Sequence, residues 1–119
     1  MTDKKDFSLR YEIIGRVVKV FLQGAFREDS GKELRDLVEK RLEEKYVRFV
    51  FDFGHSRAMS SPAVATALDL AEMIVDTNHG RLIISGLTDL NLKVFEMVGM
   101  FMYAEACTTH TEAEVRALI

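Results

Sequence analysis

The sequence predicts one α/β domain over residues 1–119, with a mixed, mostly parallel sheet of four to five strands and about four helices. Two observations predict this class. Two apolar, β-branched segments near the start are separated only by Gly15-Arg16, which indicates an opening β-hairpin. After them, short apolar segments alternate with longer amphipathic ones, and this order favours parallel strands joined by right-handed crossovers.

The predicted hairpin consists of residues 7–14 and 17–22. The first segment has the alternation of a half-buried strand, with one face formed by Phe7, Leu9, Tyr11 and Ile13. Residues 1–6, which precede it, are polar and of mixed charge, so we expect a flexible tail. Gly24 ends the second segment.

A helix is predicted next, capped by Asp29 or Ser30 and ending near Glu44. Its narrow apolar stripe on an otherwise charged surface consists of Leu34, Leu37, Val38 and Leu42. Residues 49–53 then form an apolar run interrupted only by Asp52. Such a run is typical of a central parallel strand that is covered on both sides.

The second half of the chain continues the alternation. A helix is predicted from Pro62 to about Thr77, before the stop signal at residues 78–80, and its polar residues form a single stripe. Residues 81–85 are predicted to form the fourth strand, which ends before Gly86.

The last predicted elements are shorter. Thr88 or Asp89 can cap a helix that reaches Val98 and whose apolar positions are Leu90, Val94, Met97 and Val98. A short strand is expected near residues 103–106. Residues 111–114 form a capping box, which predicts a final helix running to the C-terminus.

Composition excludes several classes of function. The net charge of −3 comes without any basic cluster, which argues against a nucleic-acid-binding protein. No apolar run approaches the roughly 20 residues needed to span a bilayer, and the N-terminus does not resemble a signal peptide. The single cysteine, Cys107, excludes an intramolecular disulfide and is more typical of a buried side chain than of a reactive thiol. We expect a cytoplasmic protein with no membrane segment.

Motifs for catalysis, metal or nucleotide binding are weak. The histidines (His55, His79 and His110) are scattered, no ligand spacing suggests a metal site, and no glycine-rich phosphate loop is present, so we expect no cofactor. Asp52, His55 and Ser61 lie close in sequence and form a conceivable triad, but the nucleophile elbow is absent. Asp52 is better explained by backbone donors at a strand end, and His55 by a surface loop. We therefore expect a protein that is not an enzyme.

The pair Ser60-Ser61 precedes Pro62 at the start of the predicted second helix. The structural interpretation makes Ser61 the N-cap and Pro62 the first helical residue. A second interpretation is compatible with the first. A phosphate on a serine here would lie beside the positive end of the helix dipole, while a partner packed over this helix end would meet a new negative charge.

Four segments carry a family resemblance: residues 24–26, residues 50–53 with the serine loop after them, residues 80–87 and residues 94–101. Together with the hairpin and the capped first helix, they make nearly the whole chain resemble the STAS domain of bacterial anti-sigma factor antagonists. In that family the loop reads Asp-Ser-Ser-Gly or Asp-Thr-Ser-Gly, and the second hydroxyl is phosphorylated by an anti-sigma factor that is also a kinase. The resemblance implies that Ser61 is the phosphoacceptor, with Ser60 as the second candidate.

The resemblance also implies a partner, an anti-sigma factor or a related GHKL-type serine kinase, together with a phosphatase. The expected contact surface consists of Phe26, His55, Ser56, Arg57, Met59, Ser60, Ser61 and Pro62. Met59 and Pro62 replace the aspartate and glycine of the family pattern. Proline stiffens the loop and removes an N–H group. Met59 can contact a partner or fold back onto the core.

Two alternatives remain open at this point. One is a constitutive interaction or scaffold domain without phosphorylation, which could self-associate through Met100, Phe101 and Met102 unless these residues pack in the core. The other is a small ligand-binding or hydrolytic domain that uses Asp52, His55 and Ser61.

Overall fold

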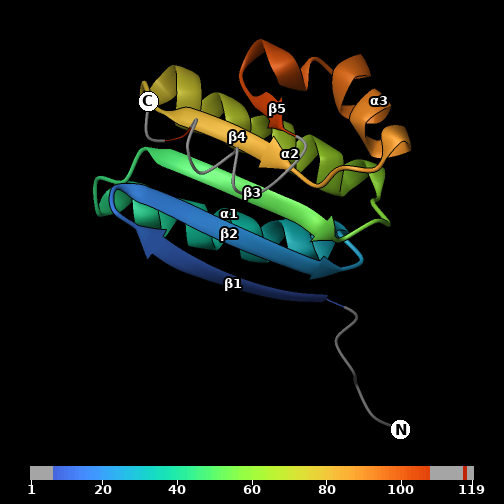
Figure 1. Cartoon of the computed structure of the whole chain (residues 1–119), viewed down its shortest axis with the longest axis horizontal. Helices are drawn as coiled ribbons and strands as arrows, with labels where there is room; N and C mark the ends of the chain where they lie inside the picture. Colours follow the sequence, from blue (N-terminus) through green and yellow to red (C-terminus); the bar gives the residue numbers. More distant parts are fainter. Residues whose placement is uncertain (1–6, 108–116, 118–119) are drawn as a thin grey trace, which may run out of the picture.

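A computed structural model describes residues 7–107 and Ala117, and contains a sheet with the strand order β1-β2-β3-β4-β5 (Figure 1). The hairpin strands β1 (Phe7–Ile14) and β2 (Val17–Gly24) are antiparallel. The strands β3 (Arg48–His55), β4 (Arg81–Ser85) and β5 (Glu105–Cys107) follow in parallel. The predicted mixed, mostly parallel sheet with an opening hairpin is therefore confirmed.

The helices are α1 (Glu28–Glu43), α2 (Ser61–Glu72) and α3 (Asp89–Met97). The π-helical turn η1 (Met73–Thr77) extends α2, so the predicted second helix changes its hydrogen-bonding pattern in its last turn. A 3₁₀ turn, η2 (Met100–Met102), follows α3. The predicted final helix lies outside the described residues except for Ala117, which is helical and buried.

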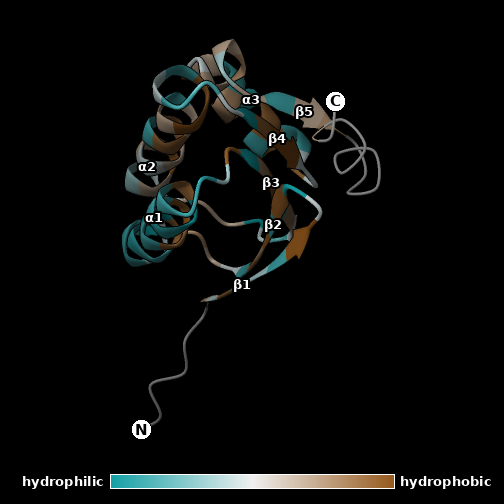
Figure 2. Cartoon of the chain, turned by 90° about the vertical axis from the view of Figure 1, so that its left-hand side faces the viewer, coloured by the Kyte–Doolittle hydropathy of each residue, from teal (hydrophilic) through white to brown (hydrophobic). Residues whose placement is uncertain are grey.

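The helices α1 and α2 lie side by side over one face of the sheet, and α3 lies beyond α2 (Figures 1 and 2). The core fills the space between this face and the helices, because every second residue of β2, β3 and β4 points toward them. Aromatic rings fill the core near the carboxyl end of β3. Phe53 makes edge contacts there with Phe26 and Phe95, at distances between ring centroids of 5.5 Å and 5.8 Å. Burying one such side chain stabilises the fold by about 1.5–3 kcal/mol.

Both predicted caps of α1 are wrong, because the helix begins earlier. Arg27 is the N-cap residue, and Ser30 lies in the first turn. The hydroxyl of Ser30 accepts a hydrogen bond from the Arg27 N–H and donates one to the carbonyl of Ala25, while Asp29 accepts from the Ser30 N–H. The two predicted residues therefore do satisfy groups at this helix end, but from positions inside the helix.

Of the apolar positions predicted for α3, only Val94 packs against the core. The buried residues of this helix are Asn91 and Phe95, whereas Leu90 and Met97 are 71% and 85% exposed. A mostly apolar helix leaves the choice of buried face to tertiary packing. Leu90, Met97 and Val98 therefore form an exposed apolar surface on this helix and at its end.

No helix among the described residues is long and apolar enough to cross a bilayer.

Candidate functional site

The candidate site is the connection from β3 to α2, at the carboxyl end of a central parallel strand. Ser60, and not Ser61 as predicted, is the N-cap of α2: its backbone is extended, and its hydroxyl accepts a hydrogen bond from the Ala63 N–H at 3.3 Å. Ser61 is the first helical residue and Pro62 the second. Proline fits this position because the second N–H of a helix has no intrahelical acceptor, so its loss costs little.

The two hydroxyls therefore differ in their surroundings. The Ser60 side chain is half-buried and committed to the cap, whereas Ser61 is exposed. Ser60 also accepts the Val64 N–H through its carbonyl. Of the first three helical residues, Pro62 has no N–H, and the N–H of Ala63 is bonded to the Ser60 hydroxyl. The N–H of Ser61 has no hydrogen bond to any described residue, so it is the one N–H in this turn that remains for an anion. An anion at Ser61 would be stabilised mainly by the helix dipole.

The connection between β2 and α1 holds the serine loop from one side. Phe26 donates its N–H to the Ala58 carbonyl at 2.8 Å and accepts the Ser60 N–H at 3.0 Å, which makes a parallel β-bridge with Met59. The Ser56 hydroxyl donates to the Gly24 carbonyl at 2.7 Å. The loop is thus fixed by backbone contacts, and the buried ring of Phe26 anchors it to the aromatic core.

Asn91 holds the loop from the other side. Its Nδ2 donates to the Arg57 carbonyl at 2.6 Å, and its own N–H donates to the hydroxyl of Thr88, the N-cap of α3. Sequence reasoning missed Asn91. The available signal is its spacing: it lies four residues before the buried Phe95, so it is a polar residue on the buried face of a short helix.

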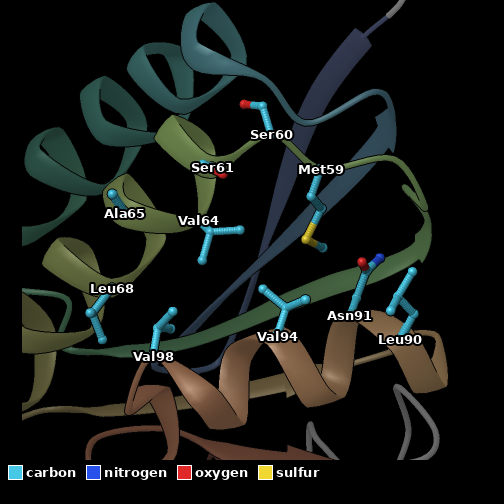
Figure 3. A pocket seen from close by; sticks show the side chains of 10 residues that line it. All are labelled: Met59, Ser60, Ser61, Val64, Ala65, Leu68, Leu90, Asn91, Val94 and Val98. Carbon is cyan, nitrogen blue, oxygen red and sulfur yellow. The ribbon is translucent and has the colours of Figure 1, made fainter.

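A groove of about 380 Å³ runs between α2 and α3, with Ser61 at one end (Figure 3). Its lining is mostly apolar and consists of Met59, Ser60, Ser61, Val64, Ala65, Leu68, Leu90, Asn91, Val94 and Val98. Met59 is half-buried: its side chain packs against the core, as one interpretation expects, and it also lines the groove. Contact between Met59 and a partner stays a prediction. The size and the polar end are typical of binding sites.

The predicted contact residues differ in exposure. His55, Arg57, Ser61 and Pro62 are exposed, and Met59 and Ser60 are half-buried. Phe26 and Ser56 are buried and instead hold the loop in place. The conceivable triad is not assembled by hydrogen bonds: the Asp52 carboxylate accepts the Gly54 N–H at 2.8 Å, and no bond joins Asp52, His55 and Ser61 among the described residues. Met100 is buried and Phe101 half-buried, but Met102 is 82% exposed.

No model of a protein family matches this sequence, and no match is found among curated proteins. Solved structures do match. The phosphorylated form of the Bacillus cell fate determinant SpoIIAA is 20% identical, with a TM-score of 0.74 over 92% of this chain and 98% of SpoIIAA. The anti-sigma factor antagonist SpoIIAA in its unphosphorylated form is 16% identical, with a TM-score of 0.75 over 93% and 97% of the two chains.

An anti-sigma factor antagonist from Mycobacterium paratuberculosis is 11% identical, with a TM-score of 0.81 over 95% of each chain. Each of these alignments covers nearly the whole of both chains. The chain therefore has the STAS fold found in anti-sigma factor antagonists, which confirms the sequence resemblance at the level of the fold.

Proposed function

We propose that this chain is a non-enzymatic bacterial signalling module of the cytoplasm that binds an anti-sigma factor or a related GHKL-type serine kinase. Phosphorylation of Ser61 would switch this binding off, and a phosphatase would restore it. The observation that carries the proposal is the position of Ser61: its exposed hydroxyl lies at the first turn of α2, at the end of an apolar groove, on a loop held from two sides.

The proposed contact surface combines the exposed loop with the groove. His55, the last residue of β3, and Arg57, on the loop that leads to Ser61, are exposed, and Pro62 is exposed next to Ser61 in the chain. These side chains can make polar or packing contacts with a partner. Leu90 adds a mostly exposed apolar side chain at the groove edge. Burial of apolar surface here would supply most of the binding free energy, and the polar loop would supply specificity.

The switch follows from the electrostatics of this arrangement. A phosphate on Ser61 adds about −1.5 to −2 charges, which the dipole of α2 tolerates in the free protein. When a partner covers the groove, the phosphate loses its hydration and is buried beside apolar side chains. This desolvation weakens binding unless a cation pairs with the phosphate. Phosphorylation would therefore change the fold little and weaken binding strongly. SpoIIAA, which has the same fold, exists in both a phosphorylated and an unphosphorylated form.

A second candidate function is a constitutive interaction domain that is never phosphorylated. Pro62 favours it, because proline removes one of the N–H groups that could otherwise bind a phosphate at the start of α2. Met59 favours it as well, since a thioether in the groove offers an adaptable apolar contact where the family pattern has a carboxylate.

Incubation with serine kinases from the same genome, followed by mass spectrometry, distinguishes the two functions. We expect phosphate on Ser61, its loss in Ser61→Ala, and its retention in the matched variant Ser60→Ala. Phosphate at another site, or none with any kinase that binds the protein, would rule out the switch.

Calorimetric titration with the same partner then tests the consequence of the charge. We expect Ser61→Asp to bind more weakly than wild type and Ser61→Asn, which is similar in size but neutral, to bind nearly as well. Equal affinity for all three proteins would support the constitutive domain instead.

A further inference from the structure

The strand β1 forms one edge of the sheet, and no described element lies beyond it (Figure 1). The residues Gly15 and Arg16 form a two-residue turn, so Ile14 and Val17 next to it are a hydrogen-bonded pair, and such pairs alternate along the hairpin. Consequently Ser8, Arg10, Glu12 and Ile14 bond to β2, while Phe7, Leu9, Tyr11 and Ile13 direct their N–H and C=O groups away from the sheet. Four residues of the eight-residue strand thus offer regularly spaced N–H and C=O groups to another strand.

Charge on this edge favours one self-pairing register. Two antiparallel copies of β1 can only shift relative to each other in steps of two residues, because the outward-directed residues must face one another. With Tyr11 opposite its own copy, Arg10 of each chain faces Glu12 of the other. The adjacent registers place Arg10 opposite Arg10 or Glu12 opposite Glu12, and like charges directly opposite are destabilising.

The polar face of the hairpin extends this complementarity. Glu12 lies across from Lys19 of β2, and the Arg10 guanidinium lies 3.9 Å over the Phe21 ring. Arg10 and Glu12 are both exposed, and they contact each other within one chain at 3.4 Å. Pairing would insert each carboxylate between Lys19 of its own chain and Arg10 of the other chain.

The opposite face of β1 carries apolar surface that pairing would cover. Tyr11 and Ile13 are 42% and 41% exposed, although they point to the same face as the buried Phe7. In the favoured register, Tyr11 packs against its own copy and Ile13 lies opposite Leu9. Leu9, Tyr11 and Leu37 form the apolar part of a shallow groove of about 470 Å³ between β1 and α1, whose other lining residues are charged side chains of α1. The incoming isoleucine would lie against this apolar part.

We propose that two copies of this chain associate through β1, in the register that pairs Arg10 with Glu12, to form a continuous ten-stranded sheet (five strands from each copy). The interface is isologous, so each favourable contact occurs twice. The proposal does not depend on the proposed function. The α2/α3 groove lies toward the other end of the sheet from β1, so a dimer would present two serine loops (Figure 1).

Sedimentation velocity of charge-reversal variants, over a wide range of concentrations, tests whether the chain dimerises through β1. We expect concentration-dependent dimers for wild type, and a roughly 10- to 100-fold weaker association for Arg10→Glu or Glu12→Arg, each of which places like charges opposite one another twice. The double variant Arg10→Glu/Glu12→Arg restores association. A mixture of the two single variants forms a heterodimer, because their charges become complementary.

Glu96→Arg, at an exposed position of α3, makes the same change in net charge as Glu12→Arg and should leave association unchanged. Circular dichroism confirms that each variant is folded. A monomer at every concentration overturns the proposal, as does a dimer that tolerates both single reversals. The proposal is also overturned if the double variant Met97→Ser/Met102→Ser is monomeric while Glu12→Arg still dimerises. That result would assign the interface to α3 and η2.

Discussion

The side-chain amide of Asn91 donates a hydrogen bond of 2.6 Å to the carbonyl of Arg57, so α3 directly holds the loop that carries Ser61. Asn91 is only 5% exposed, and it also lines the groove between α2 and α3. One buried side chain thus links the geometry of the loop to the position of the helix that forms the other wall of the groove.

Asn91→Leu should loosen this link. The substitution keeps the volume of the side chain but leaves the Arg57 carbonyl without its donor, and the free energy of unfolding should fall by about 1–2 kcal/mol in urea titration. Hydrogen exchange should accelerate at the Ser60 amide, which is bonded to Phe26 in the native loop. Lys93→Leu, at an exposed position of the same helix, is the control. Unchanged exchange at Ser60 would mean that the contacts with Phe26 and Gly24 hold the loop without Asn91.

Ser60→Ala and Ser61→Ala should differ in stability. Removing the Ser60 hydroxyl deletes the cap of α2 and should cost about 1 kcal/mol. Removing the Ser61 hydroxyl, which has no hydrogen bond among the described residues, should change the free energy of unfolding by less than about 0.5 kcal/mol. Thermal or urea unfolding of the two variants measures the difference, and the opposite order would mean that Ser61 is the cap after all.

Gly80→Ala should be among the most destabilising single changes in the chain. A Cβ at this position would collide with the carbonyl of Val47 and lie 2.9 Å from that of Ile74, and both groups belong to backbone. We expect a loss of at least about 3 kcal/mol, measured by urea unfolding. Gly99→Ala is the matched control: its positive φ strains any side chain, but a Cβ there would make only an ordinary contact of 3.6 Å with the Met102 sulfur, so a cost of only about 1 kcal/mol is expected. Equal costs would show that the backbone near Val47 can move aside.

The Arg81–Glu105 ion pair joins β4 to the short edge strand β5, with the Arg81 Nε 2.7 Å from the carboxylate. The hydrogen bond to Glu105 raises the pKa of Arg81. A raised pKa means that the stabilisation is present below the unfolded-state pKa and is lost only as the pH rises through the folded-state pKa, in strongly alkaline solution. Because this pair is partly exposed, Arg81→Gln should lower the free energy of unfolding by at most about 1 kcal/mol. The loss should be the same at neutral and at moderately alkaline pH.

Arg35→Gln provides the comparison for this pair. Arg35 contacts Asp69 at the longer distance of 3.4 Å, and that carboxylate is more exposed, so the variant should lose less stability than Arg81→Gln. Urea unfolding at several pH values measures both variants. A cost for Arg81→Gln that fades within moderately alkaline solution would contradict the assignment.

The sequence predicts the sheet well, because strand identity depends on local pattern. The bounds of β1 and β4 match the predicted segments, and β3 is parallel on both sides, as its apolar run indicates. The pattern fails for exposure within β1, where alternation predicts one buried face. Tyr11 and Ile13 are nevertheless more than 40% exposed, because β1 is an edge strand and its neighbours cover only part of it.

Helix starts and the site were harder to predict, for a physical reason. Several adjacent residues near the start of α1 and α2 can accept a backbone N–H, and tertiary contacts decide among them. In α2, the bond between the Ser60 N–H and the Phe26 carbonyl fixes Ser60 in an extended conformation, which leaves Ser61 to begin the helix. Phe26 lies far away in sequence, so no local pattern contains this information. The same applies to the bond between Asn91 and Arg57.

Leu90→Ser tests whether the groove between α2 and α3 binds the partner. Leu90 lines the groove but is 71% exposed, so the free energy of unfolding should change by less than about 0.5 kcal/mol. Its apolar surface would be buried in the complex, so affinity for the kinase that phosphorylates Ser61 should fall by roughly tenfold or more in calorimetric titration. Met97→Ser is the control, because Met97 is 85% exposed on the same helix and does not line the groove. If both variants lose affinity equally, the partner covers the outer surface of α3 and not the groove, and the charge of phosphorylated Ser61 would then act on it from a distance.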